Sequence, residues 1–405
     1  MKIENKLFGF LGVIFFTSSV FAQESQIKID AGSYPRKQSI ITLELPKSYN
    51  QKLYHLENIK TGKKAILQQK ENHTYTFILP DELQSQTSAT YKISVIKNQL
   101  KAKNTVTILK DTKKVQVKIA NKTLFDYHIQ TVYPPKGFPD YYARSGFIHP
   151  LYSPNGSVLT DDFPKGHMHQ HGIMMALTNT TFKGEKHDFW NQHSKLANVK
   201  HTEVLAIEEG PVFSSFKVKH QHYSLKYGAV LDEIWTVRIY SFQNKFLFDI
   251  VSELENITKD TLFVNKYHYG GMAYRASKHW NIDDSLHYQN KWQIKTNNGD
   301  DVATANAKAA KYVSAFGLLN GKTAGLTVFG FPQNLAYPQP IRLHPTMPYF
   351  SFSPMVNAAF TIKPKEVFIS QYRYLSYDDL PQEKHIESLN IDIELPVVVK
   401  FTAQE

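Results

Sequence analysis

The sequence predicts an all-β protein built from two consecutive units, a small N-terminal immunoglobulin-like β-sandwich and a large antiparallel β-sandwich. Two observations lead to this prediction. Segments of strand length, either apolar or alternating between apolar and polar residues, recur along the chain of 405 residues. Tyr and Phe, which favour strands, supply most of an aromatic content of 13%. No repeat period indicates a propeller or a solenoid, so we expect sandwiches.

Residues 1–22 are expected to be a secretory signal peptide. Lys2 and Lys6 make its start basic, residues 7–16 are an almost unbroken apolar run, and Ala22 ends the expected cleavage site. The run is too short to anchor the chain in a bilayer, and no later stretch has the length of a membrane span. The chain has no cysteine, which excludes disulfides. We therefore expect an exported protein, periplasmic or extracellular.

Residues 23–112 are predicted to form the small sandwich. Runs of strand length at 39–45, 74–79 and 91–96 are separated by Pro and Asn residues that favour turns. No residue of this unit indicates a chemical role.

Residues 113–405 are predicted to form the large sandwich. The alternating segment 115–119 and the turn at 121–122 indicate a hairpin. Three later runs are longer than most strands; they cover residues 213–222, 234–240 and 246–254. The alanines and lysines of 303–312 favour a short helix. We expect a loop at 331–354, and final strands at 367–374 and 391–401 that complete the large sheet.

The net charge of +11 comes from basic residues that are scattered along the chain. A nucleic-acid-binding protein would need a basic stripe or a recognised module, and the sequence has neither. We therefore expect no nucleic-acid partner. The positive charge is compatible with a preference for acidic glycans.

The candidate site is the stretch 166–172, Gly-His-Met-His-Gln-His-Gly. His167, His169 and His171 stand at every second position, and alternate residues of an extended strand share one face. Three interpretations remain open. The imidazoles bind a divalent metal, they move protons without a metal, or they fix a loop by hydrogen bonds. The cofactor is therefore unknown, with a metal possible at these three residues.

Two further segments are expected to form the opposite wall of the site. His268 precedes a Gly-Gly turn, and Arg275 follows it with a planar cation suited to carboxylates or hydroxyls. Asp188 can accept a hydroxyl, and Trp190 can stack on a sugar ring. Each has a structural alternative, such as an arginine that ties a loop to the sheet.

The segment before the histidines offers three more candidates. Asp162 can orient a histidine or bind a substrate, although paired aspartates before Phe-Pro are also common in turns. His149 and Tyr152 lie in the preceding loop and can line the same pocket. His344 is a further candidate from the late loop. A cupin metal site would add a glutamate soon after the histidines, but the first acidic residue after them is Glu185.

Several motifs, in the same order, resemble those of a bacterial family of unknown function called PmoA-like, over about residues 113–400. The motifs are Tyr127, 147–151, 155–156, 162–164, the three histidines, 188–190, 269–275 and 372–374. The resemblance implies a β-supersandwich like that of galactose mutarotases and some polysaccharide lyases, in a setting of polysaccharide use. Family members often have a histidine where this chain has Gln170.

We therefore expect an exported carbohydrate-active protein, and favour an enzyme that acts on a sugar or glycan by histidine-centred acid/base chemistry. Lyase, epimerase and hydrolase reactions all fit this description. The alternatives are a non-catalytic glycan-binding module and a metal-dependent, cupin-like enzyme. Genuine methane oxygenase activity is not expected, because the subunit of that name spans the membrane several times.

Overall fold

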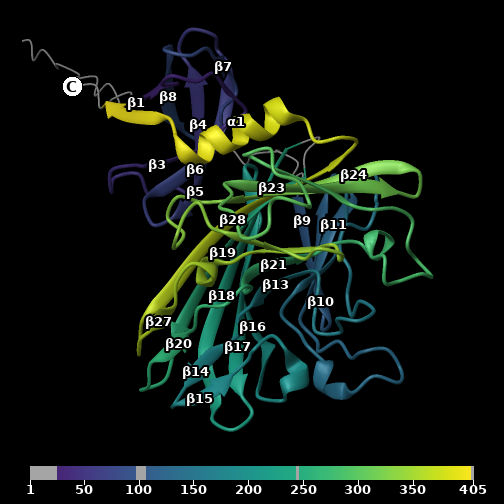
Figure 1. Cartoon of the computed structure of the whole chain (residues 1–405). Helices are drawn as coiled ribbons and strands as arrows, with labels where there is room; N and C mark the ends of the chain where they lie inside the picture. Colours follow the sequence, from purple (N-terminus) through teal and green to yellow (C-terminus); the bar gives the residue numbers. More distant parts are fainter. Residues whose placement is uncertain (1–24, 97–105, 243–245, 403–405) are drawn as a thin grey trace, which may run out of the picture.

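The computed structural model describes residues 25–96, 106–242 and 246–402, so the expected signal peptide lies outside the described residues. Nearly all regular structure in these ranges is antiparallel β-strand, with one α-helix, α1 (Glu383–Glu394). This confirms the predicted all-β class. Figure 1 shows the small N-terminal unit at one end, the large unit at the other, and α1 between them. No helix in the described ranges has the length and apolar character needed to cross a membrane.

The small unit is a curled sheet rather than two separate sheets. Its hydrogen-bonded order is β29 (Val398–Thr402), β1 (Gln26–Asp30), β8 (Ser88–Val95), β4 (Leu53–Asn58), β5 (Lys64–Glu71), β6 (Thr74–Ile78) and β3 (Ile40–Glu44). A separate ribbon pairs β2 (Arg36–Lys37) with β7 (Glu82–Leu83). Phe77 in β6 and Tyr91 in β8 have two strands between them, yet their ring centroids are 6.2 Å apart. The sheet therefore folds over its own apolar core, as a sandwich does.

The large unit contains two eight-stranded sheets and one four-stranded sheet. The first runs β25 (Ile341–Leu343), β26 (Tyr349–Phe352), β21 (Gly271–Arg275), β13 (Ile173–Ala176), β12 (Ile148–Leu151), β11 (Lys122–His128), β10 (Lys114–Ile119) and β9 (Val106–Lys110). The second runs β16 (Ala197–Glu208), β17 (Phe213–Ser224), β18 (Gly228–Tyr240), β19 (Phe246–Asn256), β28 (Val367–Asp378), β24 (Lys322–Gly330), β23 (Tyr312–Leu319) and β22 (Gln293–Thr296). The small sheet runs β15 (Glu185–His187), β14 (Thr180–Phe182), β20 (Leu262–Val264) and β27 (Phe360–Ile362).

The two large sheets share one apolar core, as the sequence predicted for a sandwich. Alternate residues of β10 and β17 are buried, so each strand turns one face inward. Phe125 of the first sheet lies 6.2 Å from Phe216 and 5.0 Å from Phe248 of the second, measured between ring centroids. Short 3₁₀ turns interrupt the connections: η1 (Asp140–Tyr142), η2 (Gln192–Ser194), η3 (Lys278–Trp280) and η4 (Pro354–Val356).

Several details differ from the sequence-based expectation. Residues 303–312 form turns rather than a helix, because the Asp301 carboxylate caps a tight turn and Ala307 has a φ of 62°. The expected loop at 331–354 contains β25 and β26. Residues 391–394 belong to α1, whose buried Ile386, Leu389 and Ile393 have helical spacing.

The boundary between the units also differs from the expected one. β9 pairs with β10, so the large sheet begins before residue 113. β29 pairs along its length with β1, so the last strand completes the small unit rather than the large one. The join is polar as well as apolar, since Arg36 of the small unit forms a 2.8 Å ion pair with Asp392 of α1. The chain thus leaves the small unit once and returns to it at the end.

Candidate functional site

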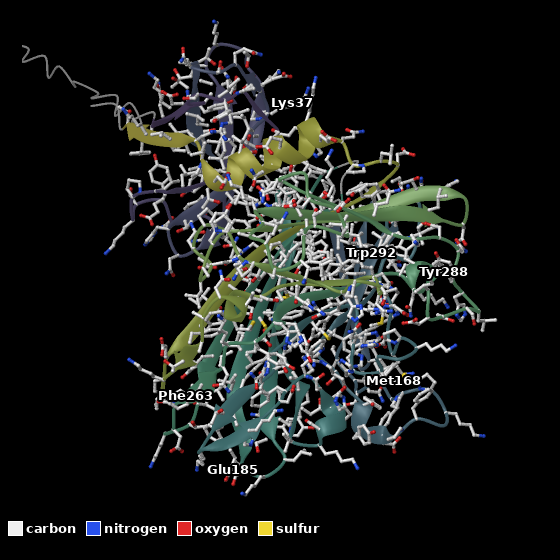
Figure 2. The ribbon with its side chains drawn as sticks, in the orientation of Figure 1. Lys37, Met168, Glu185, Phe263, Tyr288 and Trp292 are labelled. Carbon is white, nitrogen blue, oxygen red and sulfur yellow. The ribbon has the colours of Figure 1, made fainter. Side chains whose placement is uncertain are left out.

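The histidine-rich stretch lies in the connection between β12 and β13, and it is not a strand. His167 N–H donates to the Pro164 carbonyl at 3.0 Å, and Gln170 N–H donates to the His167 carbonyl at 3.0 Å, so the chain makes consecutive turns. The expectation that the three imidazoles share one face of an extended strand was therefore wrong. In Figure 2 the loop is marked by Met168, on the same side of the large unit as Tyr288 and Trp292.

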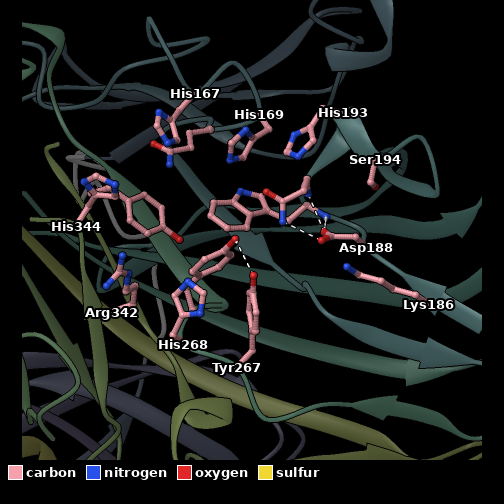
Figure 3. A pocket seen from close by; sticks show the side chains of 15 residues that line it. His167, His169, Lys186, Asp188, His193, Ser194, Tyr267, His268, Arg342 and His344 are labelled. Atoms are coloured by element: carbon pink, nitrogen blue, oxygen red, sulfur yellow. Dashed lines mark hydrogen bonds between the residues drawn. The ribbon is translucent and has the colours of Figure 1, made fainter. Parts of the chain in front are cut away.

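A cavity of about 460 Å³ opens beside this loop. Its wall comes from four places in the sequence: the histidine loop, β15 with the segment after it, the segment before β21, and β25 with the start of β26. The lining residues are His167, His169, Gln170, Lys186, Asp188, Trp190, Asn191, His193, Ser194, Tyr267, His268, Tyr269, Arg342, His344 and Tyr349. Figure 3 shows them gathered around one space.

Four imidazoles form an arc along the wall. Successive ring centroids from His344 to His167, His169 and His193 are 5.7, 5.5 and 5.6 Å apart. Figure 3 shows His167, His169 and His193 side by side, with His344 at the end of the row. No side-chain hydrogen bond joins His169 to another described residue, although only 8% of its surface is exposed.

Burial keeps the imidazoles of His167, His169 and His344 neutral. The pKa of His169 lies well below its usual value, first because the ring is buried and then because His167 is close. Burial and His167 lower the pKa of His344 to about 4. The pKa of His167 is lowered by burial and then by the charge of Arg275. At neutral pH these three rings are therefore bases without a proton.

Aromatic rings face the arc. Trp190 stacks on Tyr349 with a centroid distance of 5.6 Å and an interplanar angle of 21°, and Tyr269 meets it edge-on at 5.1 Å. Trp190 Nε1 and the Tyr349 hydroxyl are buried and have no hydrogen-bond partner among the described residues. Trp190 is 3% exposed and Tyr349 2% exposed, so the platform presents only a small part of its aromatic surface to the cavity.

Asp188 shapes this wall and is fully occupied. One carboxylate oxygen accepts the N–H groups of Trp190 and Asn191 at 3.0 and 2.7 Å. The other accepts the Thr178 hydroxyl and the Asn191 amide, both at 2.8 Å. A carboxylate has about four acceptor positions, so little capacity is left for a substrate hydroxyl.

His171 lies behind the cavity wall. Its ring is fully buried between Phe147 and Phe163, and its Nδ1 lies 2.5 Å from the Asp162 carboxylate. In the described parts of the chain, no three His, Asp or Glu side chains are placed to hold a metal ion. The structure therefore does not bring His167, His169 and His171 together as one set of metal ligands, because His171 is bonded to Asp162 and does not line the cavity.

Arg275 also lies behind the wall. Its fully buried guanidinium donates to the Gln170 side chain at 3.0 Å and lies 4.0 Å from Asp161. Burial lowers the pKa of Arg275 to about 10 and raises the pKa of Asp161 to about 6. Gln170 lines the cavity, so Arg275 acts on the site through Gln170 and through its charge.

The remaining predicted residues lie at the rim or elsewhere. His268 is exposed at the rim, next to the rings of Tyr267 and Tyr269. His149 lies outside the lining and bonds to Thr160 through Nδ1 at 2.9 Å. Tyr152 lines a different, shallow surface hollow.

Sequence reasoning found His167, His169, His268, Asp188 and Trp190 in the lining and missed most of their neighbours. His193 stands three residues after Trp190, and this short spacing could have indicated that both line the same cavity. His344 was named only as a further candidate. The missed residues are Gln170, Lys186, Asn191, His193, Ser194, Tyr267, Tyr269, Arg342 and Tyr349.

Fold and cavity together define an all-β protein with a pocket lined by histidines and aromatic rings. The chain belongs to a family of unknown function, DUF6807, whose family model matches residues 114–390. This confirms the expected domain of unknown function over that range. No curated protein matches the chain.

The chain also matches solved structures, among them the alpha-galactosidase from Lactobacillus brevis. The two share 10% sequence identity and a TM-score of 0.26. The match covers 67% of this chain but 39% of the alpha-galactosidase chain, so most of that protein has no counterpart here.

Proposed function

We propose that the chain is an exported carbohydrate-active enzyme that transfers protons on a sugar or glycan. The observation that carries the proposal is His169, a buried neutral imidazole without a hydrogen-bond partner among the described residues, beside the stacked Trp190 and Tyr349. An aromatic platform suits a sugar ring, and a neutral imidazole can remove a proton at neutral pH.

The other residues have supporting roles in this proposal. His167, whose ring centroid is 5.5 Å from that of His169, is placed to exchange a proton at a neighbouring position on the substrate. Trp190 and Tyr349 form the aromatic wall beside the substrate. Asp188 keeps Trp190 and Asn191 in place.

The lining favours a lyase or an epimerase over a hydrolase. A common glycosidase mechanism needs two carboxyl groups across the bond that is cleaved. Asp188 is the only carboxylate among the described residues that line the cavity, and its oxygens are occupied. The same observation favours a second candidate function, a glycan-binding module without catalysis.

The proposal includes two further expectations from the sequence. The chain is a PmoA-like domain, on the ground of its motifs, and it is exported, on the ground of residues 1–22. Oxygenase activity is not part of it.

Replacing His169 separates enzyme from binding module. His169→Gln keeps a polar side chain but removes the base, and His55→Gln in the small unit is the matched control. We expect turnover of the responsive glycan to fall by about a hundredfold or more in His169→Gln, the usual size of a general-base contribution, while binding measured by calorimetry persists. If no glycan in a broad panel is ever converted by the wild-type protein, the enzyme proposal fails and the binding module remains.

A further inference from the structure

A second cavity, of about 630 Å³, shares the lining residue Arg342 with the first. Neighbours of Arg342 in the sequence divide between the two cavities, with His344 in the first and Leu343 in the second. Both volumes lie in the range of ligand pockets. A ligand that fills both cavities therefore contacts Arg342.

The second cavity also has aromatic walls. Trp280, Trp292 and Tyr288 line it, and Figure 2 shows Trp292 and Tyr288 on the same side of the large unit. Trp280 is held in place because its indole N–H donates to the Leu318 carbonyl at 3.0 Å. A second sugar ring finds the same kind of surface here as in the first cavity.

Arg342 is a positioned cation without an acidic partner. Its Nη1 donates to the Asn306 side-chain oxygen at 3.1 Å, and that oxygen also accepts the Leu343 N–H at 3.1 Å. Arg342 forms no ion pair with any carboxylate of the described ranges. One edge of the guanidinium is therefore fixed, and its other N–H groups remain for a ligand.

Basic side chains outnumber acidic ones around both cavities. Lys186 lines the first cavity and Lys291 the second; both are exposed and neither pairs with a described acid. The acidic lining residues are already engaged, Asp188 by four donors and Asp301 by three hydrogen bonds to one oxygen. Each lining therefore carries two basic side chains, Arg342 and one lysine, against one aspartate.

The charge of Arg342 affects the pKa of two histidines that line the first cavity. It contributes, after burial, to the lowered pKa of His268 and, after burial and His167, to that of His344. Asp283 acts in the opposite direction on His344, but it is exposed and lines neither cavity.

We propose that the two cavities form one elongated site for an acidic oligosaccharide, with its anionic group bound by Arg342. The proposal rests on the proposed function and names the substrate class of the same site. The shared chemistry is an oxyanion carried on a sugar, either a carboxylate or a sulfate ester. A guanidinium binds either group through two parallel N–H bonds, which makes Arg342 the specificity-determining residue.

The test compares three sets of oligosaccharides of equal length by calorimetry: oligouronates, sulfated oligosaccharides and neutral oligosaccharides. Arg342→Gln removes the charge at the junction, and Lys47→Gln, an exposed position in the small unit, is the matched control. We expect the wild-type protein to bind one acidic set at least about tenfold more tightly than the neutral set, as a charged hydrogen-bonded contact allows. Arg342→Gln abolishes this preference and Lys47→Gln retains it, and the acidic set that responds identifies the anionic group.

Tyr288→Ala tests whether the site is elongated. We expect this variant to weaken binding of the acidic oligosaccharide by about tenfold, as loss of an aromatic contact does, and to leave binding of the acidic monosaccharide unchanged. Equal weakening of both ligands, or of neither, overturns the elongated site.

The outcomes separate this inference from the proposed function. If the wild-type protein binds neutral and acidic sets equally, or Arg342→Gln weakens both by the same factor, the acidic substrate class is wrong and the carbohydrate function stands. If no oligosaccharide binds, both are wrong.

Discussion

The pH dependence of stability provides a test of the buried histidines, and His149 is the best placed. Its Nδ1 lies 2.9 Å from the Thr160 hydroxyl, whose oxygen also accepts the Leu151 N–H at 2.9 Å. The Thr160 proton is therefore directed at the imidazole, which must be neutral to accept it. Burial lowers the pKa of His149 from 6.5 to about 4. His149→Asn keeps an acceptor at the position of Nδ1 and removes the titration.

The sign and size of the change in the free energy of unfolding with pH follow from proton linkage. The unfolded chain binds a proton at His149 below pH 6.5, whereas the folded chain binds it only near pH 4. Acid therefore favours unfolding, and the stability associated with neutral His149 is lost as pH falls from 6.5 toward 4. With these two values, the loss between pH 7.5 and pH 5 is about 2 kcal/mol, since one pKa unit corresponds to about 1.4 kcal/mol.

The assay is urea unfolding of the wild-type protein and His149→Asn at both pH values. We expect the wild-type free energy of unfolding to fall by about 2 kcal/mol more than that of the variant over this range. NMR of the imidazole provides an independent measurement, in which the His149 signal stays in its neutral position down to about pH 5. Equal pH dependence of the two proteins, or titration of His149 near its ordinary pKa, would refute the reasoning.

Two further substitutions test the packing around the site and the core. Gly172→Ala places a Cβ 2.0 Å from the Ile148 carbonyl oxygen at a φ of +35°, and should lower the free energy of unfolding by about 4 kcal/mol. Gly166→Ala is the control, because Gly166 has a φ of +83° and its added Cβ meets nothing within 4 Å, so the free energy of unfolding should fall by only about 1 kcal/mol. Equal losses of stability for the two variants in thermal melts would contradict the clash at Gly172. Glu233 is a fully buried carboxylate that accepts hydrogen bonds from the Trp235 indole, the Ser252 hydroxyl and the His222 imidazole. Glu233→Gln turns an amide group toward these donors and should lower the free energy of unfolding in urea by about 3–5 kcal/mol. The exposed control Glu203→Gln should change little, and a loss below about 1 kcal/mol for Glu233→Gln would contradict an ionised, fully bonded carboxylate.

The long strands could be predicted because their pattern is local. In β17 Phe216 and Val218 are buried while Lys217 and Lys219 between and after them are not, so the alternation is visible in the sequence. The turn at Asn121 joins strands that are neighbours in sequence. The segment 391–394 was misassigned because Ile391, Ile393 and Leu395 fit a period of two as well as a helix. Only burial against both units selects the helix.

The site was harder to predict because its contacts are distant in the sequence. His167 meets His344, and Trp190 meets Tyr349, across more than 150 positions that carry no common pattern. Clustering of histidines correctly indicated the region. It could not show that His171 turns away toward Asp162, because this depends on two turns set by backbone hydrogen bonds.

The pairing of β29 with β1 has a consequence for how the chain acquires its structure during synthesis. β1 is made first and its outer partner last, after the whole large unit has emerged. Until then one edge of β1 presents free backbone N–H and C=O groups, which another chain can pair with. The small unit therefore cannot finish folding ahead of the large one. A ribosome that stops before residue 398 releases a protein with an open sheet edge far from the cavity, and such a chain is prone to associate with its own copies.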